Sequence, residues 1–393
     1  MSSKNSFPRT LLLQPKEVQL AYFEGYKAAH PRLVDMNKTL MRNINQSAGA
    51  SFIFVYGPTG IGKTTMRLRV EQELIEQALP TLITDRGCIP VVGVEAVGTE
   101  SGNFNWKDYF TRALAALEEP LIDHKINYGT RGIQRNSSGQ LVIEPKVAAP
   151  ELRRALENAL KHRRPKAFFI DEAQHMQKMA SGRRLQDNMD CLKSLANLTG
   201  VVHVLIGTYE LLMFRNLSAQ LSRRSVDLHF SRYRADVSEE LEAFMNVLWT
   251  FQRHLPLENE PDLLTHWKYF YAYSLGCVGI LKDWLHRALS DALNEGALTL
   301  TLKHLQQRAW SDDQCHKMLQ EITEGEKQLT QSVHKRQKLY EALGLGGEQE
   351  PTPSVNSGSE ALPKPQNEAQ QSRRRNLGVG KPNPQRRKVG GVE

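Results

Sequence analysis

Residues 51–65, which read SFIFVYGPTGIGKTT, are the most informative part of this sequence. An apolar run typical of a buried strand, 51–56, leads into a turn that fits G-x-x-x-x-G-K-[ST], with Gly57, Gly62, Lys63 and Thr64 in the fixed places. Glycines let successive backbone N–H groups point at one anion, and the N-terminus of a helix that begins at Lys63 adds partial positive charge. The pattern therefore predicts a phosphate-binding loop between a strand and a helix.

Lys63 supplies a full positive charge to this loop, and Thr64 offers a hydroxyl to Mg²⁺. The segment 66–78 has apolar side chains on one helical face, namely Met66, Val70, Leu74 and Ala78. The loop is thus preceded by a predicted strand and followed by a predicted helix, as the motif requires; a glycine turn that matches by chance is the alternative. The candidate nucleotide-binding residues here are Gly57, Pro58, Thr59, Gly60, Ile61, Gly62, Lys63, Thr64 and Thr65.

Composition sets wide bounds on the rest of the molecule. The chain has 393 residues, enough for about two or three domains of ordinary size. Its 51 Lys and Arg against 43 Asp and Glu give a net charge of +8, which favours a polyanionic partner without requiring one. The four cysteines are far apart, so neither a zinc site nor a disulfide framework is indicated. No apolar run reaches the roughly eighteen residues of a membrane span, and the N-terminus is polar, so we expect a cytoplasmic protein with no membrane partner.

The residues before the phosphate loop form a predicted helical lead-in, 1–50. Helical segments at 15–26 and 33–44 are separated by the break at His30-Pro31. Such a pair could pack beside a nucleotide base, or it could simply cover one edge of a sheet. After the loop helix, the β-branched run 89–97 predicts a second parallel strand, and a helix is expected at 106–117.

Two basic segments are candidates for contact with a phosphate backbone. The irregular stretch 118–150 contains a turn signal at 136–139 that predicts a protruding hairpin, and the stretch 177–188 is predicted to be a loop before a helix at 189–199. The candidate DNA-contact residues in the two segments are Lys125, Arg131, Arg135, Lys146, Lys178, Arg183 and Arg184. Ordinary solvated surface charge is the alternative, since scattered Lys and Arg are common on any surface.

Two acids end the hydrophobic strand predicted at 166–172. Asp171 could hold the water shell of a metal ion beside the phosphate loop, and Glu172 could orient an attacking water. The sequence Asp-Glu-Ala-Gln-His at 171–175 also resembles the acidic box of nucleic-acid helicases, but no second helicase core follows. A zinc pair is not indicated, because the order H-E-x-x-H is absent.

Polar residues also mark the last two predicted strands of the sheet. The buried run 201–208 ends at Thr208, whose hydroxyl could bond the water or the γ-phosphate, cap the helix expected at 209–214, or do both. Arg223 and Arg224 come directly before the short apolar strand 226–230. They are either a solvated pair, or one of them reaches the γ-phosphate bound by a neighbouring subunit.

Taken in order, the phosphate loop, Asp171-Glu172, Thr208 and Arg223-Arg224 resemble the motifs of AAA+ ATPases. The run Ser-Leu-Gly-Cys-Val-Gly-Ile-Leu-Lys at 274–282 resembles the turn and helix start of the lid domain in the initiator-related branch, with Lys282 in the place of a basic sensor. The resemblance implies an α/β P-loop NTPase fold with a central parallel sheet, followed by a small all-helical lid domain. It also implies that Thr64 and Asp171 hold Mg²⁺, that Glu172 orients water, that Thr208 senses the γ-phosphate, and that Lys282 reports nucleotide from the lid.

Within that branch, the arrangement from His30-Pro31 through 170–175 to the Gly-Thr-Tyr-Glu-Leu run at 207–211 is similar to the transposition regulators TnsC and TniB. That resemblance covers about 10–310. It implies Mg²⁺-dependent ATP hydrolysis and homo-oligomers, as rings or helical filaments, on double-stranded DNA. It further implies two protein partners, a transposase and a target-selector protein. A replication initiator or helicase loader, or a signalling or secretion ATPase without DNA binding, shares many of these motifs.

The expected division of the chain follows from these motifs and from composition. We expect a lead-in at 1–50, a nucleotide-binding domain at 51–235 with the insertion 118–150, a lid at 236–312, a helical extension at 313–343 and a disordered basic tail at 344–393. The aromatic residues of the lid lie at helical spacing and are expected in its core. The basic clusters at 373–375 and 386–388 could bind nucleic acid or an acidic surface, or only keep the tail soluble.

Overall fold

The computed structural model describes residues 6–98, 104–117, 133–135, 141–143, 149–176, 183–215, 219–330 and 338–344. For 133–135, 141–143, 183–184, 215, 219–220 and 330 it describes the backbone alone. The chain divides into two units, 1–335 and 336–393. The described part of the second unit is a short helical segment at 338–342 with a turn at 343–344; the rest of the predicted basic tail lies outside the described residues.

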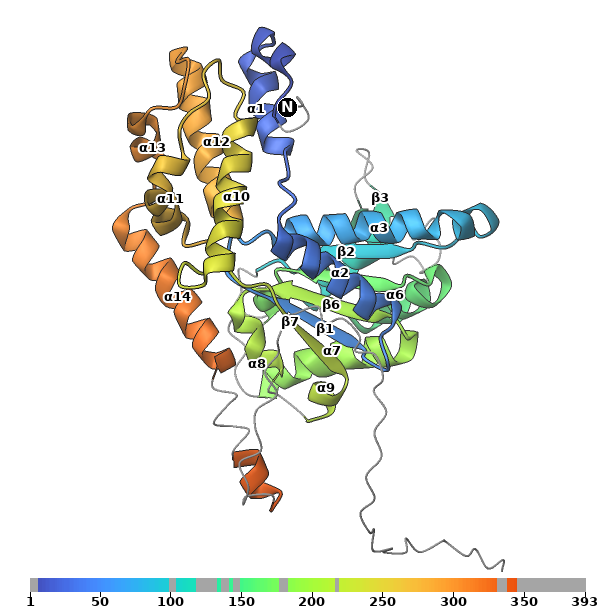
Figure 1. The fold of residues 1–393 in the computed structure, drawn as a ribbon. Coiled ribbons are helices and arrows are strands. Elements are labelled where there is room, and N and C mark those ends of the chain that lie inside the picture. Colours follow the sequence, from blue (N-terminus) through green and yellow to red (C-terminus); the bar gives the residue numbers. More distant parts are fainter. Residues whose placement is uncertain are drawn as a thin grey trace, which may run out of the picture. The chain divides into compact units, whose positions relative to one another are not determined.

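A five-stranded parallel sheet forms the centre of the first unit (Figure 1). Its strands run in the order β2-β5-β6-β1-β7, with bounds β1 Phe52–Tyr56, β2 Val91–Glu95, β5 Ala167–Asp171, β6 Val202–Gly207 and β7 Ser225–His229. Every residue of β1, β5 and β6 is buried. A strand covered on both faces needs apolar side chains on both, which explains why these segments read as unbroken hydrophobic runs. Because the strands are parallel, their carboxyl ends share one edge, and that edge carries the site.

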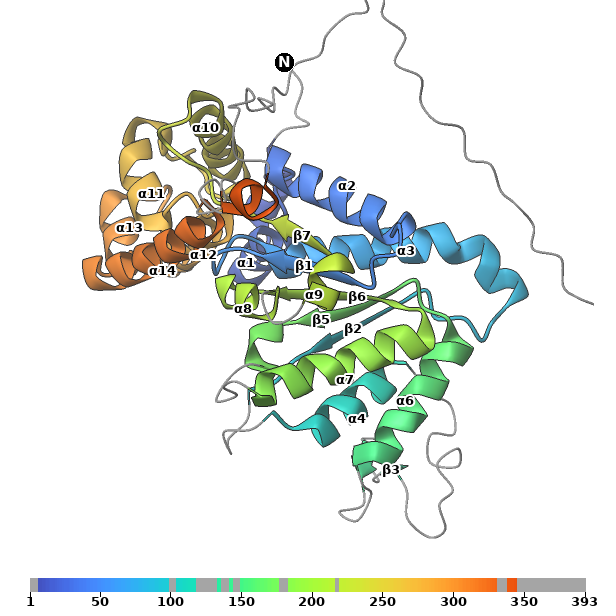
Figure 2. The same cartoon turned by 90° about the horizontal axis from the view of Figure 1, so that it is seen from below.

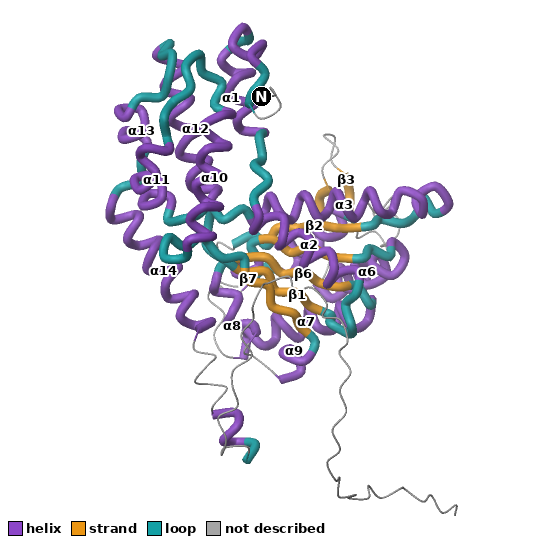
Figure 3. Tube along the Cα trace, viewed as in Figure 1, coloured by secondary structure: helices purple, strands orange, loops and turns teal. Residues whose placement is uncertain are grey.

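Helices cover both faces of the sheet, as the views in Figures 2 and 3 show. One face is covered by α2 Pro31–Asn45 and α3 Lys63–Thr84, the other by α4 Trp106–Ala116, α6 Ala149–Arg163 and α7 Arg183–Thr199. The buried face of α3 consists of Lys63 and the four apolar residues predicted from the sequence, Met66, Val70, Leu74 and Ala78. The predicted helix 106–117 is likewise confirmed, with Tyr109, Phe110 and Leu114 buried. The fold is thus the predicted α/β architecture with a central parallel sheet.

The two basic segments differ in how well they were predicted. The hairpin is confirmed for the backbone, because β3 Ile133–Arg135 pairs antiparallel with β4 Leu141–Ile143. The loop predicted at 177–188 is wrong from 183 onward, because α7 already begins there. Leu185, Met189 and Leu192 are buried at a spacing of four and three residues, so they form one helical face that extends the helix by nearly two turns.

The candidate DNA-contact residues fall largely beyond what the structure describes. Lys125, Arg131, Lys146 and Lys178 lie outside the described residues, and for Arg135, Arg183 and Arg184 only the backbone is described. Arg183 and Arg184 are the first two residues of α7 rather than part of a loop.

A helical bundle follows the sheet. It contains α10 Ser238–His254, α11 Trp267–Ser274, α12 Val278–Glu295 and α13 Leu302–Arg308, packed around the fully buried Trp284. Phe23 of α1 Lys16–Gly25 belongs to the same core. The lead-in therefore does not act as one unit: α2 packs on α3 and β7, whereas α1 joins the bundle. Among the aromatic residues expected in the core, Phe251 and Phe270 are buried, whereas Trp249 is 38% exposed.

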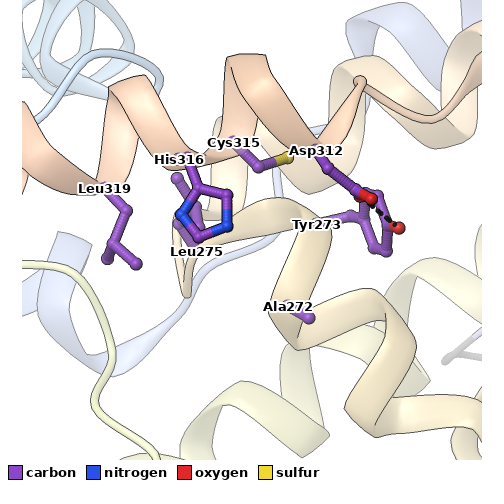
Figure 4. A pocket seen from close by; sticks show the side chains of 7 residues that line it. All are labelled: Ala272, Tyr273, Leu275, Asp312, Cys315, His316 and Leu319. Carbon is purple, nitrogen blue, oxygen red and sulfur yellow. Dashed lines mark hydrogen bonds between the residues drawn. The ribbon is translucent and has the colours of Figure 1, made fainter.

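The helix α14 Asp312–Thr330 leaves the bundle and returns to the sheet domain. Near its start, a cavity of about 330 Å³ lies between α11 and α14, bordered by Tyr273, Leu275, Asp312 and Cys315 among others (Figure 4). Near its end, Ile322 joins the core on the α2–α3 side of the sheet, and Glu326 pairs with Arg232 at 3.0 Å. The short connecting elements are η2 Arg9–Leu13, η3 Ala173–Met176, η4 Tyr209–Leu211, α8 Leu212–Arg215, α9 Ala219–Arg223 and η5 Leu264–His266. Among the helices that the structure describes, none is both long and apolar enough to traverse a bilayer.

Candidate nucleotide-binding site

The predicted phosphate loop connects the end of β1 to the start of α3. Gly62 is the N-cap of α3 with φ 106°, a conformation that favours glycine. Gly57 is needed for a different reason, because a Cβ there would lie 2.1 Å from the carbonyl oxygen of Phe230. Its N–H also donates to the carbonyl of Gly207 at 3.3 Å. The loop therefore begins between the carboxyl ends of β6 and β7.

Lys63 lies beneath this loop and is only 7% exposed. Its Nζ donates to the carbonyl oxygens of Gly57 at 3.1 Å and Pro58 at 2.8 Å. Burial lowers the pKa of Lys63, and the nearby charges of Glu172 and Asp171 oppose that shift. A phosphate oxygen at the loop would give the buried ammonium a charged acceptor, which forms a stronger bond than a neutral carbonyl.

The two predicted metal ligands are brought together by the fold. Thr64 Oγ1 donates to Asp171 Oδ2 at 3.2 Å, although the two residues are 107 positions apart. Asp171 is 4% exposed, and its other oxygen accepts from the backbone N–H of Glu172 at 3.0 Å. A hydroxyl and a carboxylate are hard oxygen donors of the kind that Mg²⁺ uses together with water and substrate phosphates. These residues fit a magnesium–nucleotide complex.

Arg67 is a neighbour of this pair that the sequence analysis did not identify. Its Nε donates to Asp171 Oδ2 at 3.0 Å, and its Nη1 pairs with Glu71 at 2.6 Å. Arg67 lies three residues after Thr64 on α3, so both side chains share one face of the helix and reach the same carboxylate. The available signal was the spacing of Arg67 and Glu71 by four residues, which is typical of an ion pair within a helix.

Glu172 follows the end of β5 in a left-handed backbone conformation, with φ 50°. A residue other than glycine rarely adopts this conformation, and such strain clusters at functional sites. The carboxylate Oε2 accepts a hydrogen bond of 2.5 Å from Nε2 of Gln174. Gln174 is also a residue to which the sequence analysis gave no role.

Thr208 directly follows β6 and is linked to the same carboxylate through Gln174. Its hydroxyl is buried and has no hydrogen-bond partner among the described residues. The side chain makes no capping bond to η4, so the capping alternative does not account for it. The backbone N–H of Thr208 donates to Oε1 of Gln174 at 3.3 Å. An unpaired hydroxyl at the sheet edge suits a residue that bonds to a ligand.

The start of α12 contacts the phosphate loop directly. Ile280 N–H donates to the carbonyl of Gly60 at 3.2 Å, and a Cβ on Gly279 would lie 2.4 Å from that same oxygen. The motif at 274–282 therefore brings the helical bundle into backbone contact with the loop. Lys282 does not extend toward the loop here, because its Nζ donates to the carbonyl of Glu24 in α1 at 2.6 Å.

The paired arginines lie at the opposite end of the sheet. In the parallel register of β1 and β7, Phe52 faces Ser225 and Tyr56 faces His229. Arg223 and Arg224 precede Ser225, so they are separated from the phosphate loop after Tyr56 by the length of a strand, roughly 15 Å. Both arginines are exposed. Arg224 Nη1 donates to Asn197 at 2.6 Å, whereas Arg223 has no partner among the described residues.

Comparisons with known proteins give one family match and several similar solved structures. Residues 46–213 match the sequence model of a family described as an AAA domain. A search of curated protein sequences found no match. Similar solved structures include the ORC2 protein of Aeropyrum pernix in ADPNP-ADP complexes, with 15% identity and a TM-score of 0.47 over 73% of this chain and 70% of that chain. The ORC1 protein of Aeropyrum pernix in complex with DNA has 18% identity and a TM-score of 0.47 over 78% and 70%.

A third similar structure is Cdc6p of Pyrobaculum aerophilum, with 14% identity and a TM-score of 0.46 over 73% of this chain and 69% of that chain. The family match contains β1, the phosphate loop, Asp171, Glu172 and Thr208. Together with the five-stranded parallel sheet and its glycine loop, it identifies the fold of residues 46–213 as that of an AAA+ P-loop NTPase.

Proposed function

We propose that this protein binds ATP together with Mg²⁺ and hydrolyses it. The observation that supports this best is the 3.2 Å contact between Thr64 and Asp171, formed next to the buried ammonium of Lys63. Two chain segments, the start of α3 and the end of β5, thereby place a cation, a hydroxyl and a carboxylate around the mouth of one glycine loop. Phosphoryl transfer depends chiefly on positioning and electrostatic stabilisation, which these groups provide.

Each side chain has a role in this proposal. Lys63 bonds the β- and γ-phosphates, Thr64 and Asp171 hold the metal ion, and Glu172 orients the attacking water. The hydroxyl of Thr208 bonds the γ-phosphate, which would pair a group that is buried and unpaired in the protein alone. Mg²⁺ supplies neutralisation of the charge on the phosphate oxygens.

Two substitutions test the proposed activity. Lys63→Ala should abolish binding of a fluorescent ATP analogue, and Glu172→Gln should bind it normally while ATP turnover falls to background. Lys38→Ala, which removes an exposed lysine from α2, is the control and should match the native protein in both assays. Normal turnover by Glu172→Gln would remove this carboxylate from the mechanism.

We further propose that the protein assembles as a ring or helical filament on double-stranded DNA and there recruits or activates a transposase at a target chosen by a selector protein. The support is the sequence resemblance to TnsC and TniB together with the net charge of +8. The position of Arg223 and Arg224 also supports assembly, because at their end of the sheet they could serve the nucleotide of a neighbouring subunit but not their own.

A replication initiator or helicase loader is the second candidate. The contact of Gly279 and Ile280 with Gly60 supports it as it supports the first candidate, because the motif that makes this contact resembles the lid of the initiator-related branch, to which both belong. Both candidates predict DNA binding, and they differ in the protein that the assembly engages.

Binding to duplex DNA tests both candidates. Affinity should increase with a non-hydrolysable ATP analogue and fall steeply as salt rises, because phosphate contacts release counterions. Stimulation of strand transfer by a cognate transposase then favours the first candidate, and loading of a replicative helicase favours the second. A protein that does not bind DNA at low salt, with or without the analogue, contradicts both.

A further inference from the structure

Gln174 lies between the carboxyl ends of β5 and β6 and is only 5% exposed. Both polar atoms of its side-chain amide form hydrogen bonds. The nitrogen Nε2 donates to Glu172 Oε2 at 2.5 Å, and the oxygen Oε1 accepts from the backbone N–H of Thr208 at 3.3 Å. One side chain therefore links the carboxylate proposed to orient water with the turn that carries the unpaired hydroxyl.

The main chain at Gly207 leaves space for the side-chain amide of Gln174. A Cβ on Gly207 would lie 2.2 Å from Gln174 Oε1, so a larger residue at the end of β6 would displace the amide. The bond also requires an amide, because a carboxylate of the same size cannot donate to Glu172 and a hydrocarbon cannot bond at either end.

The bond to Gln174 restricts how the Glu172 carboxylate can turn. Glu172 follows a strand in a left-handed conformation, so its side chain starts from a short, strained turn. One carboxylate oxygen is held by the amide, which leaves Oε1 to accept a hydrogen bond from water. Because the other end of the amide is bonded to Thr208, the direction of the carboxylate depends on the position of the β6 end.

We propose that Gln174 is a positioning residue for ATP hydrolysis. Its two hydrogen bonds fix the orientation of the Glu172 carboxylate relative to the turn that contains Thr208. The inference rests on the hydrolysis proposed above and goes beyond it in naming the residue that aligns the general base. A residue that only fills space below Gly207 would support folding and nucleotide affinity without a separate effect on the chemical step.

Kinetics of two variants separate these roles. Gln174→Met keeps the length of the side chain and removes both bonds, and Gln174→Glu keeps the size and the acceptor but removes the donor. In both, kcat should fall by about tenfold or more, while the Kd for a non-hydrolysable ATP analogue stays within about twofold of the native value.

A second test measures thermal stability and does not depend on ATP hydrolysis. In the nucleotide-free protein, the loss in Tm of the double variant Gln174→Met with Glu172→Ala should differ from the sum of the single losses, because the two residues are bonded. Gln174→Met combined with Asp108→Ala is the matched control and should be additive, since Asp108 pairs with Arg112 on α4.

The outcomes distinguish this inference from the proposed function. If the native protein hydrolyses ATP, and Gln174→Met keeps kcat within about twofold with an additive Tm cycle, the positioning role is overturned and the ATPase stands. If kcat and analogue affinity fall together and the Tm cycle is additive, Gln174 is structural only. A native protein that neither binds nor hydrolyses ATP would overturn the proposed function, and the positioning role with it.

Discussion

At the scale of single residues, the carboxyl edge of the sheet contains three polar groups whose arrangement costs stability in the protein alone. Lys63 is buried with a lowered pKa, Glu172 has a left-handed backbone, and the Thr208 hydroxyl is buried without a partner among the described residues. A strained backbone or an unsatisfied buried polar group costs on the order of 1–3 kcal/mol. Such costs are retained where function requires them, and here all three coincide with the proposed nucleotide site.

Thr208→Val tests whether the unpaired hydroxyl has that function. Valine has nearly the same shape, and it removes a buried group that has no bond to lose, so Tm should stay the same or rise. In contrast, kcat for ATP should fall by about a hundredfold if the hydroxyl bonds the γ-phosphate in the transition state.

Thr199→Val is the matched control, since the Thr199 hydroxyl donates to the carbonyl of Leu195 at 2.7 Å. This change should lower Tm and leave kcat unchanged. An unaltered kcat in Thr208→Val would show that its hydroxyl takes no part in turnover.

At the scale of elements, β6 carries a histidine into the centre of the sheet. His203 is fully buried between Phe52 and Phe168, and burial lowers its pKa to about 4. The pKa of His30, the N-cap of α2, is also lowered to about 4, by burial and by the nearby charge of Arg32. Both histidines are therefore neutral in the folded protein at pH values where the unfolded chain already binds protons.

The sign of the resulting pH dependence follows from these pKa values. Between the unfolded value near 6.5 and the folded value near 4, the unfolded chain holds more protons, so the free energy of unfolding falls as pH falls. Each histidine contributes a slope of up to about 1.4 kcal/mol per pH unit. Urea unfolding at pH 7 and pH 5 should show this loss, and His203→Phe should reduce it. An equal loss in His203→Phe and the native protein would contradict the assignment to His203.

The contact between α12 and the phosphate loop can be tested by a substitution at Gly279. Gly279→Ala would place a methyl group 2.4 Å from the Gly60 carbonyl, so the helix and loop must move apart. We expect a loss of about 1–3 kcal/mol in stability and weaker binding of an ATP analogue, because the loop loses its support.

Gly25→Ala is the control for that substitution. Gly25 ends α1, and an added Cβ there would meet nothing within 4 Å. This change should be neutral or slightly stabilising. Equal nucleotide affinity in Gly279→Ala and Gly25→Ala would show that the contact with α12 does not support binding.

At the scale of the whole molecule, the proposed site is complete only if a second copy contributes an arginine. Arg223 and Arg224 lie a strand's length from their own phosphate loop, and Arg224 is already bonded to Asn197. We therefore expect Arg223 to be the residue that acts in trans. Arg223→Ala should reduce ATPase activity of the assembled protein by about 10³-fold or more, and Arg224→Ala should reduce it far less.

Mixing two inactive proteins tests the action in trans. Lys63→Ala cannot bind nucleotide but retains Arg223, whereas Arg223→Ala has an intact nucleotide site. Mixed assemblies should regain activity, because some intact sites then face a neighbour that supplies the arginine. The double variant Lys63→Ala with Arg223→Ala, mixed with Arg223→Ala, should remain inactive. If the first mixture shows no recovery although the two proteins co-assemble, Arg223 does not act between subunits.

The local features of this protein follow from short stretches of its sequence. The buried strand, the glycine loop and the helix beginning at Lys63 could be predicted because apolar runs, glycine and helical spacing act over a few residues. The start of α7 at Arg183 was not predicted from local features. The burial of Leu185, which places the first turn of α7 against the core, became evident only in the structure.

Which side chains meet at the carboxyl edge of the sheet depends on the tertiary structure. Thr64 meets Asp171, and Gln174 meets Thr208 across 34 positions, because the strand order brings the ends of β1, β5 and β6 together. It also directed Lys282 to α1 rather than to the phosphate loop. Hydrogen bonds of this kind depend on the relative placement of whole elements, which spacing along one segment does not encode.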